Sequence, residues 1–102
     1  KNPDYGNGGL TSLMGTFEAS RPGGSLTLAE KYFDQAIAQS KGESAGPWVA
    51  KAESIALKKQ DQKIFTQWLN EAIQIAKAHR NLENEVMRER AMWLLETVDD
   101  LF

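Results

Sequence analysis

The chain has 102 residues, no cysteine and a formal net charge of −2, with 41 % hydrophobic and 25 % charged residues. This composition is typical of a globular protein, and a chain of this length buries about 60–70 % of its unfolded surface, enough for a single domain over residues 1–102. The lack of cysteine excludes disulfides, thiolate metal sites and cysteine nucleophiles, and charges of both signs are scattered, so no basic surface for nucleic acid is expected.

Helical spacing of apolar residues and turn signals predict an all-α fold. We expect helical hairpins at about residues 10–40 and 47–78, followed by one long terminal helix at about 82–102. The two helices of the first hairpin are separated by RPGG (21–24), because proline ends a helix and glycine permits a tight turn.

Four residues are predicted to start helices. Thr27 begins a TLAE capping box, in which the hydroxyl caps the second helix and Glu30 reaches back to the backbone. Pro47 suits the first position of the third helix, where no N–H is needed. Asp61 and Asn81 are the expected N-caps of the fourth and last helices.

One apolar pattern occurs twice in the chain. KYFDQAIA (31–38) and QWLNEAIQ (67–74) match column by column, 36 residues apart. Ala29, Phe33 and Ala36 also keep the A-x3-F-x2-A spacing of the tetratricopeptide repeat. A helical hairpin cannot bury its inner face alone, so repeated hairpins bury it by stacking. The pattern predicts tetratricopeptide-like hairpin repeats, an α-α superhelix with a long C-terminal capping helix.

The terminal helix carries apolar residues three and four positions apart, which predicts one inward face. The members of this face are Leu82, Val86, Leu94, Val98 and Leu101. Arg90 or Ala91 fills the gap in it, and Met87 and Trp93 lie beside it. A helix in this position is expected to cover the end of the core.

The tryptophans and the histidine are the residues that first suggest a site. Tryptophan is enriched in binding hot spots but also packs in cores. Trp68 lies inside the repeated stripe, which favours the core, whereas for Trp48 and Trp93 core packing and partner contact are equally supported. His79 has no serine or carboxylate partner at a catalytic spacing, which indicates a structural or solvent-facing role.

Several segments resemble one known family. RAMWLLETVDDLF (90–102) resembles the closing signature of the T components of tripartite ATP-independent (TRAP) transporters, the TatT family. GESAGPWVAKAES (42–54), QDQKIFTQWLNEAI (60–73) and FEASRPGGSLTLAEKYFDQAI (17–37) are also similar to the family pattern. The resemblance covers nearly the whole chain but only the C-terminal part of the family pattern. We therefore expect this domain to be part of a longer protein.

The resemblance implies a non-enzymatic periplasmic accessory protein, lipid-anchored through a segment before Lys1. Its implied partner is the periplasmic solute-binding protein of the transporter, the P component. A homo-oligomer, with a trimer favoured, and a hydrophobic small molecule as ligand are further implications, and no cofactor or metal is implied. Arg90 belongs to the family signature, which favours a buried or interfacial ion pair for this residue.

Three functions fit these observations. The first hypothesis is a docking module that contacts its partner through Trp48, Trp93 and Arg90. The second is a carrier, which predicts an apolar channel for a lipid-like ligand lined by several of Phe17, Tyr32, Trp48 and Trp93. The third is a generic tetratricopeptide scaffold for protein–protein interaction in an unrelated pathway. An enzyme is the least supported function, because the sequence contains no nucleophile, metal or phosphate-loop motif.

Overall fold

The computed structural model describes residues 9–102, and this part of the chain consists of helices joined by turns. The helices are α1 (Gly9–Ser20), α2 (Leu26–Gln39), α3 (Gly46–Lys51), its π-helical continuation η2 (Ala52–Ala56), α4 (Gln62–Ala78), α5 (Leu82–Glu96) and α6 (Val98–Leu101). The predicted all-α fold is confirmed, whereas the tetratricopeptide assignment stays a prediction. No helix within residues 9–102 combines the length and the apolar character needed to cross a lipid bilayer.

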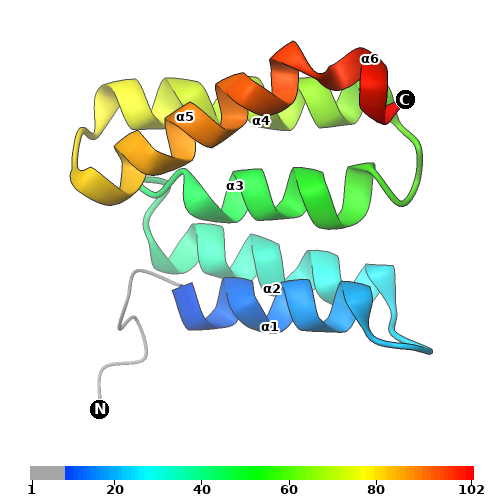
Figure 1. Cartoon of the computed structure of the whole chain (residues 1–102). Coiled ribbons are helices and arrows are strands. Elements are labelled where there is room, and N and C mark those ends of the chain that lie inside the picture. Colours follow the sequence, from blue (N-terminus) through cyan, green and yellow to red (C-terminus); the bar gives the residue numbers. More distant parts are fainter. Residues whose placement is uncertain (1–8) are drawn as a thin grey trace.

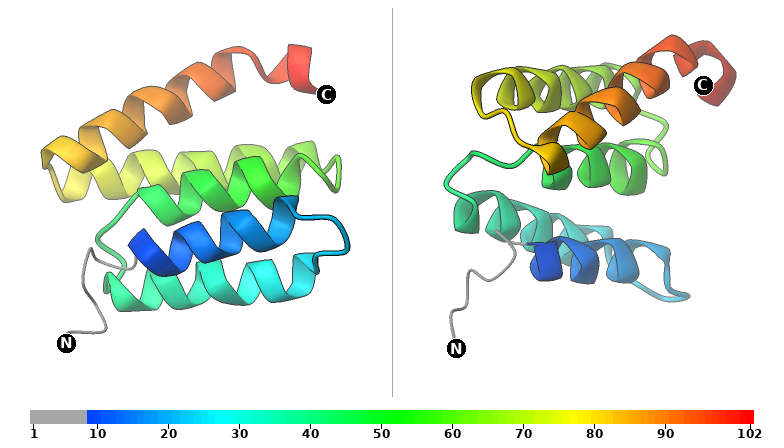
Figure 2. Two further views of the ribbon diagram at one scale, coloured as in Figure 1. Left: turned by 60° about the horizontal axis from the view of Figure 1, so that its bottom comes forward. Right: turned by 60° about the vertical axis from the view of Figure 1, so that its left-hand side comes forward.

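The helices form two stacked hairpins and a crossing helix. α1 pairs with α2, α3 and η2 pair with α4, and α5 packs across the second hairpin (Figure 1). α1, α3 and α5 form one layer, and α2 and α4 form the other (Figure 2). The first hairpin therefore occupies one end of the stack, and α4 and α5 occupy the other.

The residues repeated in the two hairpins lie at the centre of the packing. Phe33 and Leu69 are fully buried, as are Ala36 and Ala72 at the other matching positions. α1 approaches α2 so closely that a Cβ added at Gly15 would lie 3.0 Å from the Phe33 ring. Small residues at these contacts let the helices approach until the larger side chains interlock.

Trp68 joins the two parts of the hydrophobic core. It is half-buried, and it packs against the cluster that contains Phe33 and Ile55 as well as the cluster that contains Leu69 and Ala72. This placement agrees with the core role expected from its position in the repeated stripe. The second hairpin is thus held on the first by a shared aromatic side chain.

The start of α2 differs from the prediction. Ser25 is the N-cap, and the Leu28 N–H donates to its hydroxyl oxygen at 3.1 Å. Thr27 lies inside the helix, so the predicted capping box was wrong. The Ser25 N–H donates at 2.9 Å to the carboxylate of Glu18 in α1, which takes the role expected of Glu30. A carboxylate from the preceding helix can do this because the α1–α2 turn is short.

The other predicted caps are confirmed. Asp61 accepts a hydrogen bond from the Ile64 N–H at 3.1 Å, and Asn81 accepts one from the Asn84 N–H at 2.8 Å. Pro47 lies in the first turn of α3, which begins one residue earlier than predicted. A helix cap depends only on residues within a few positions of each other, so it can be predicted from a short stretch of sequence.

The inward face of α5 also differs from the prediction. Leu82 and Val86 are 83 % and 53 % exposed, whereas Asn84 is 1 % exposed. The Asn84 amide donates to the carbonyl oxygens of Glu43 and His79 at 2.9 and 2.7 Å, and its oxygen accepts from the Ala45 N–H at 3.0 Å. These bonds join three segments, and they satisfy backbone groups that would otherwise be buried without partners. A polar residue therefore takes the place expected for the two apolar ones.

The predicted long terminal helix is divided in the structure. α5 ends at Glu96, and Thr97 turns the chain into the short helix α6. The Thr97 hydroxyl donates to the Trp93 carbonyl oxygen at 3.1 Å, a contact that competes with the helical hydrogen bonds. The turn brings the Phe102 ring edge-on against Phe65, with ring centroids 5.2 Å apart. The C-terminal residues thereby cover the core beside α4.

Replacing Asn84 by Ala is expected to lower the free energy of unfolding by about 2–4 kcal/mol, because one buried N–H and two carbonyl oxygens lose their partners. Urea unfolding followed by circular dichroism measures this. Asn70→Ala, at an exposed position of α4, is the control and should stay within about 0.5 kcal/mol of the original chain. Equal stability of the two variants would contradict the role given to Asn84.

Candidate functional site

Arg90 of α5 forms a two-pronged ion pair with Glu53 of η2. The Nε–Oε2 and Nη2–Oε1 distances are both 2.6 Å. The side chains are 49 % and 26 % exposed, so the pair lies at the surface where α5 crosses the second hairpin. The hydrogen bonds and charge of Glu53 raise the pKa of the Arg90 guanidinium above its already high ordinary value. Glu53 therefore holds the charged Arg90 in an ion pair between two helices. The pair lies at the surface and is not buried, and its place in an interface with a partner stays a prediction.

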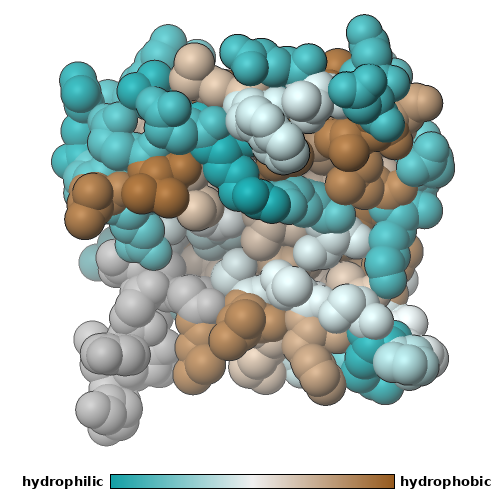
Figure 3. Space-filling model, viewed as in Figure 1, coloured by the Kyte–Doolittle hydropathy of each residue, from teal (hydrophilic) through white to brown (hydrophobic). Residues whose placement is uncertain are grey.

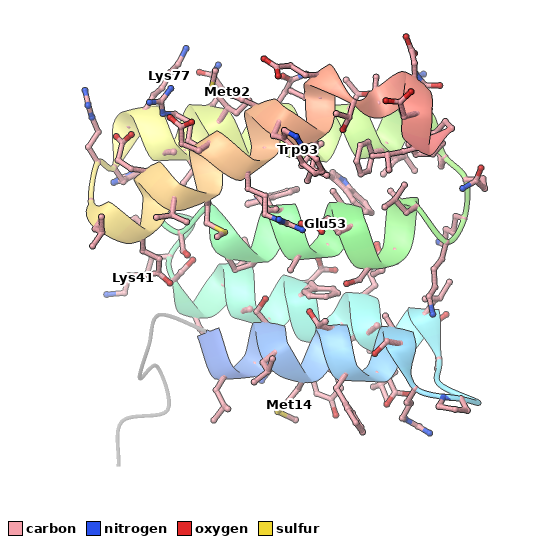
Figure 4. All side chains as sticks on the ribbon, viewed as in Figure 1. Met14, Lys41, Glu53, Lys77, Met92 and Trp93 are labelled. Carbon is pink, nitrogen blue, oxygen red and sulfur yellow. The ribbon has the colours of Figure 1, made fainter. Side chains whose placement is uncertain are left out.

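Trp93 lies one helical turn beyond Arg90 and is 54 % exposed. Figure 4 shows Trp93 and Glu53 on the same side of the molecule, where α5 passes over α3. We call Glu53, Arg90 and Trp93 the α5 patch. Of the two uses expected for Trp93, the exposed position favours partner contact over core packing.

Glu53 belongs to a π-helical turn. The Leu57 N–H donates to the Ala52 carbonyl oxygen, five residues back, at 3.3 Å. Single π turns within helices are rare and occur often at functional sites. Here the turn buries the side chains beside Glu53 on the inner face and leaves its carboxylate at the edge of α5.

Trp48 lies in a different setting, beside a buried lysine. The Lys51 ammonium is 5.5 Å from the centroid of the Trp48 ring and 4.5 Å from that of Trp68. The same nitrogen pairs with Asp34 at 2.8 Å and with Glu30 at 3.8 Å, and Lys51 is only 6 % exposed. Two ring faces and two carboxylates compensate the loss of hydration of the ammonium. This cluster joins α2, α3 and α4 and ties Trp48 to the packing of the two hairpins.

Phe17 and Tyr32 are apart from the α5 patch. Tyr32 is half-buried on α2, and Phe17 is 65 % exposed on α1. An open hollow of about 490 Å³ beside Phe17 is lined by side chains of α1 alone, namely Leu13, Met14, Thr16 and Phe17. Tyr32, Trp48 and Trp93 do not line it, so this hollow is not the channel expected for a carrier.

The remaining polar groups form no reactive arrangement that the structure describes. His79 is exposed at the end of α4, and its carbonyl oxygen is held by Asn84. Among residues 9–102, no three His, Cys, Asp or Glu side chains are grouped to hold a metal ion.

Two residues of these arrangements were missed by sequence reasoning. Lys51 had a usable signal, because a lysine one helical turn after Trp48 is placed to reach the aromatic ring. Glu53 had none, because it pairs with Arg90 across 37 residues and a change of helix. Only the crossing of α5 over η2 brings these two charges together.

Replacing Trp48 and Trp93 by alanine, one at a time, tests whether Trp48 packs in the core while Trp93 lies at the surface. Trp48→Ala should lower the free energy of unfolding by about 2–4 kcal/mol, since the ring packs in the core and against Lys51. Trp93→Ala should lower it by less than about 1 kcal/mol, since more than half of the residue already contacts solvent. Urea unfolding followed by helical circular dichroism provides both values. A larger loss for Trp93 than for Trp48 would return Trp93 to the core.

The comparison with known proteins agrees with the resemblance in the sequence. The model of one protein family, described as TRAP transporter T-component, matches residues 1–102. Searches of curated proteins and of solved structures gave no match. Because the family match extends over the whole sequence, the chain belongs to the TRAP transporter T-component family.

Proposed function

We propose that this chain is a periplasmic accessory protein of a TRAP transporter that docks the solute-binding P component through the α5 patch. The family supports an accessory role in such a transporter. The observation that carries the docking proposal is the exposed Trp93 beside the Arg90–Glu53 pair. The proposal needs no covalent chemistry by this chain. It includes self-association, which is also implied by the family resemblance.

The α5 patch has the composition of a binding hot spot. Tryptophan and arginine are the residues most enriched at positions that dominate binding energy. Both side chains come from one helix, and Glu53 holds the Arg90 guanidinium in place before a partner arrives. Such preorganisation lowers the conformational entropy lost on binding. Since Glu53 already neutralises Arg90, Trp93 is the group with most surface left to offer.

The main alternative is a carrier of a hydrophobic molecule. The apolar hollow on α1 is its best support, but that hollow is open and is formed by one helix. A lipid-like ligand is usually enclosed by several elements that bury most of its surface. Docking is therefore the better supported function for this domain.

Trp93→Ala should weaken binding of the transporter's purified P component at least about ten-fold, because a central aromatic side chain of an interface is lost. Isothermal titration calorimetry gives the dissociation constants. Met92→Ala is the matched control, since Met92 is the preceding residue and is 40 % exposed. It should change the affinity by less than about three-fold.

Circular dichroism must first show that both variants keep their helices. Equal affinities of Trp93→Ala and the original chain would place the docking surface elsewhere. Equal losses in the two variants would indicate a general effect on α5 instead of a contact by Trp93.

A further inference from the structure

Three basic side chains converge on one hollow beside the turn that joins α4 to α5. Lys77 and Arg80 come from the end of α4 and the turn after it, and Arg88 comes from the second turn of α5. Together with Glu85 they line an open hollow of about 310 Å³. Figure 3 shows hydrophilic residues over this part of the molecule, at the upper left, and Figure 4 shows Lys77 pointing outward there.

Glu85 holds two of these cations in place. Its Oε2 atom accepts a hydrogen bond from Arg80 Nε at 3.0 Å, and its Oε1 atom accepts from Arg88 Nη2 and Nε at 3.1 and 3.3 Å. Hydrogen bonding from Arg88 is the main cause that lowers the pKa of the Glu85 carboxyl. The carboxylate therefore stays charged, and each of its oxygens binds a different guanidinium group.

Unused hydrogen-bond donors remain around the hollow. In the described part of the chain, the hydrogen bond and the ion pair of Arg80 both use Nε, which leaves its terminal nitrogens Nη1 and Nη2 for a ligand. None of the ion pairs within residues 9–102 includes Lys77. Both side chains are exposed, Arg80 by 73 %. An anion in the hollow can therefore reach donors from both of them.

The helix dipole accounts for only part of this arrangement. Lys77 and Arg80 lie at the C-terminal end of α4, where positive charge is favourable. Arg88 lies in the interior of α5, where the dipole gives no such gain, and it still binds the same carboxylate as Arg80. Three cations from two helices are thus brought closer together than the helix ends alone require.

The side chains that line the hollow have an excess of positive charge. Three cations surround one carboxylate, although the whole chain has a net charge of −2. Glu89 lies beside Arg88, with Oε2 3.9 Å from Nη2, but its side chain is 75 % exposed and does not line the hollow. An excess of two positive charges suits one doubly charged oxyanion, and arginine and lysine are common ligands of phosphate groups.

We infer that this hollow binds a phosphate group, with Lys77 and the terminal nitrogens of Arg80 as its main donors and Arg88 as a third cation beside it. This inference goes beyond the proposed function and does not depend on docking by the α5 patch. Because the donors are exposed and are screened by salt, the expected dissociation constant at low ionic strength is on the order of 1 mM.

Titration of the isotope-labelled chain with inorganic phosphate, followed by the nuclear magnetic resonance signals of the backbone amides, tests the site. The signals of residues 77–88 should shift and reach saturation, whereas sodium chloride at the same ionic strength should give no saturable shift. Lys77→Gln should raise the dissociation constant at least about three-fold, because one donor and one charge are lost. Replacing Arg80 by Gln as well should abolish saturation.

Lys63→Gln is the matched control. Lys63 is also an exposed lysine of α4, but it lies at the other end of the helix, and its replacement changes the net charge equally. This variant should bind phosphate like the original chain. An equal loss of binding in Lys63→Gln and Lys77→Gln would overturn the proposal, because it would show general charge attraction. Circular dichroism should show unchanged helices in every variant, since the replaced side chains are exposed.

Sedimentation with vesicles distinguishes free phosphate from the phosphate of a lipid headgroup. The vesicles contain phosphatidylglycerol, and vesicles of phosphatidylcholine alone are the neutral control. Free phosphate as the ligand predicts that the chain stays in the supernatant. Binding to the anionic vesicles that is lost in Lys77→Gln and kept in Lys63→Gln would assign the phosphate group to a lipid. Absence of binding to both inorganic phosphate and the vesicles would overturn the proposal.

Discussion

The stacking of the second hairpin on the first decides where every exposed surface of this protein lies. Trp68 packs against both core clusters, and the Lys51 ammonium lies between the rings of Trp48 and Trp68 while it pairs with Asp34 of the first hairpin. A buried ammonium is tolerated only when its lost hydration is replaced. These contacts therefore favour one particular stacking, in which α2, α3 and α4 meet around a single charge.

Local signals explain which parts of the fold could be predicted from the sequence. The apolar spacing located the helices, and Asp61 and Asn81 were correctly identified as caps because a cap depends on residues three positions apart. The same reasoning named Thr27 as the cap of the second helix, because Thr27 and Glu30 have the spacing of a capping box. The carboxylate that takes this role comes from Glu18, seven residues before Ser25, which a local motif does not include.

The surface features needed information from distant residues. Leu82 and Val86 fitted an inward apolar stripe, but the hydrogen bonds of Asn84 to the α2–α3 connection decide which face of α5 is buried. The bond of Arg90 to Glu53 likewise depends on how α5 crosses η2. Periodicity indicates that a helix has a buried face, and the partners of its polar residues determine which face that is.

The exposed apolar residues are concentrated at the two ends of the stack. In the described part of the chain, nine large hydrophobic residues are exposed, and all of them lie on α1, α2 or α5. They are Leu10, Leu13, Met14, Phe17, Leu28, Leu82, Val86, Met92 and Trp93. α3 contacts α1, α2, α4 and α5 and is therefore covered on several sides, whereas α4 turns polar side chains outward. Within residues 9–102, the apolar side chains left at the surface are therefore those of α1, α5 and Leu28.

The α5 patch suits contact with a separate partner. It combines an exposed aromatic ring with an ion pair between two helices, and charged groups at an interface contribute orientation and specificity more than affinity. Trp93 therefore supplies apolar area for such a contact, and the Arg90–Glu53 pair supplies its orientation.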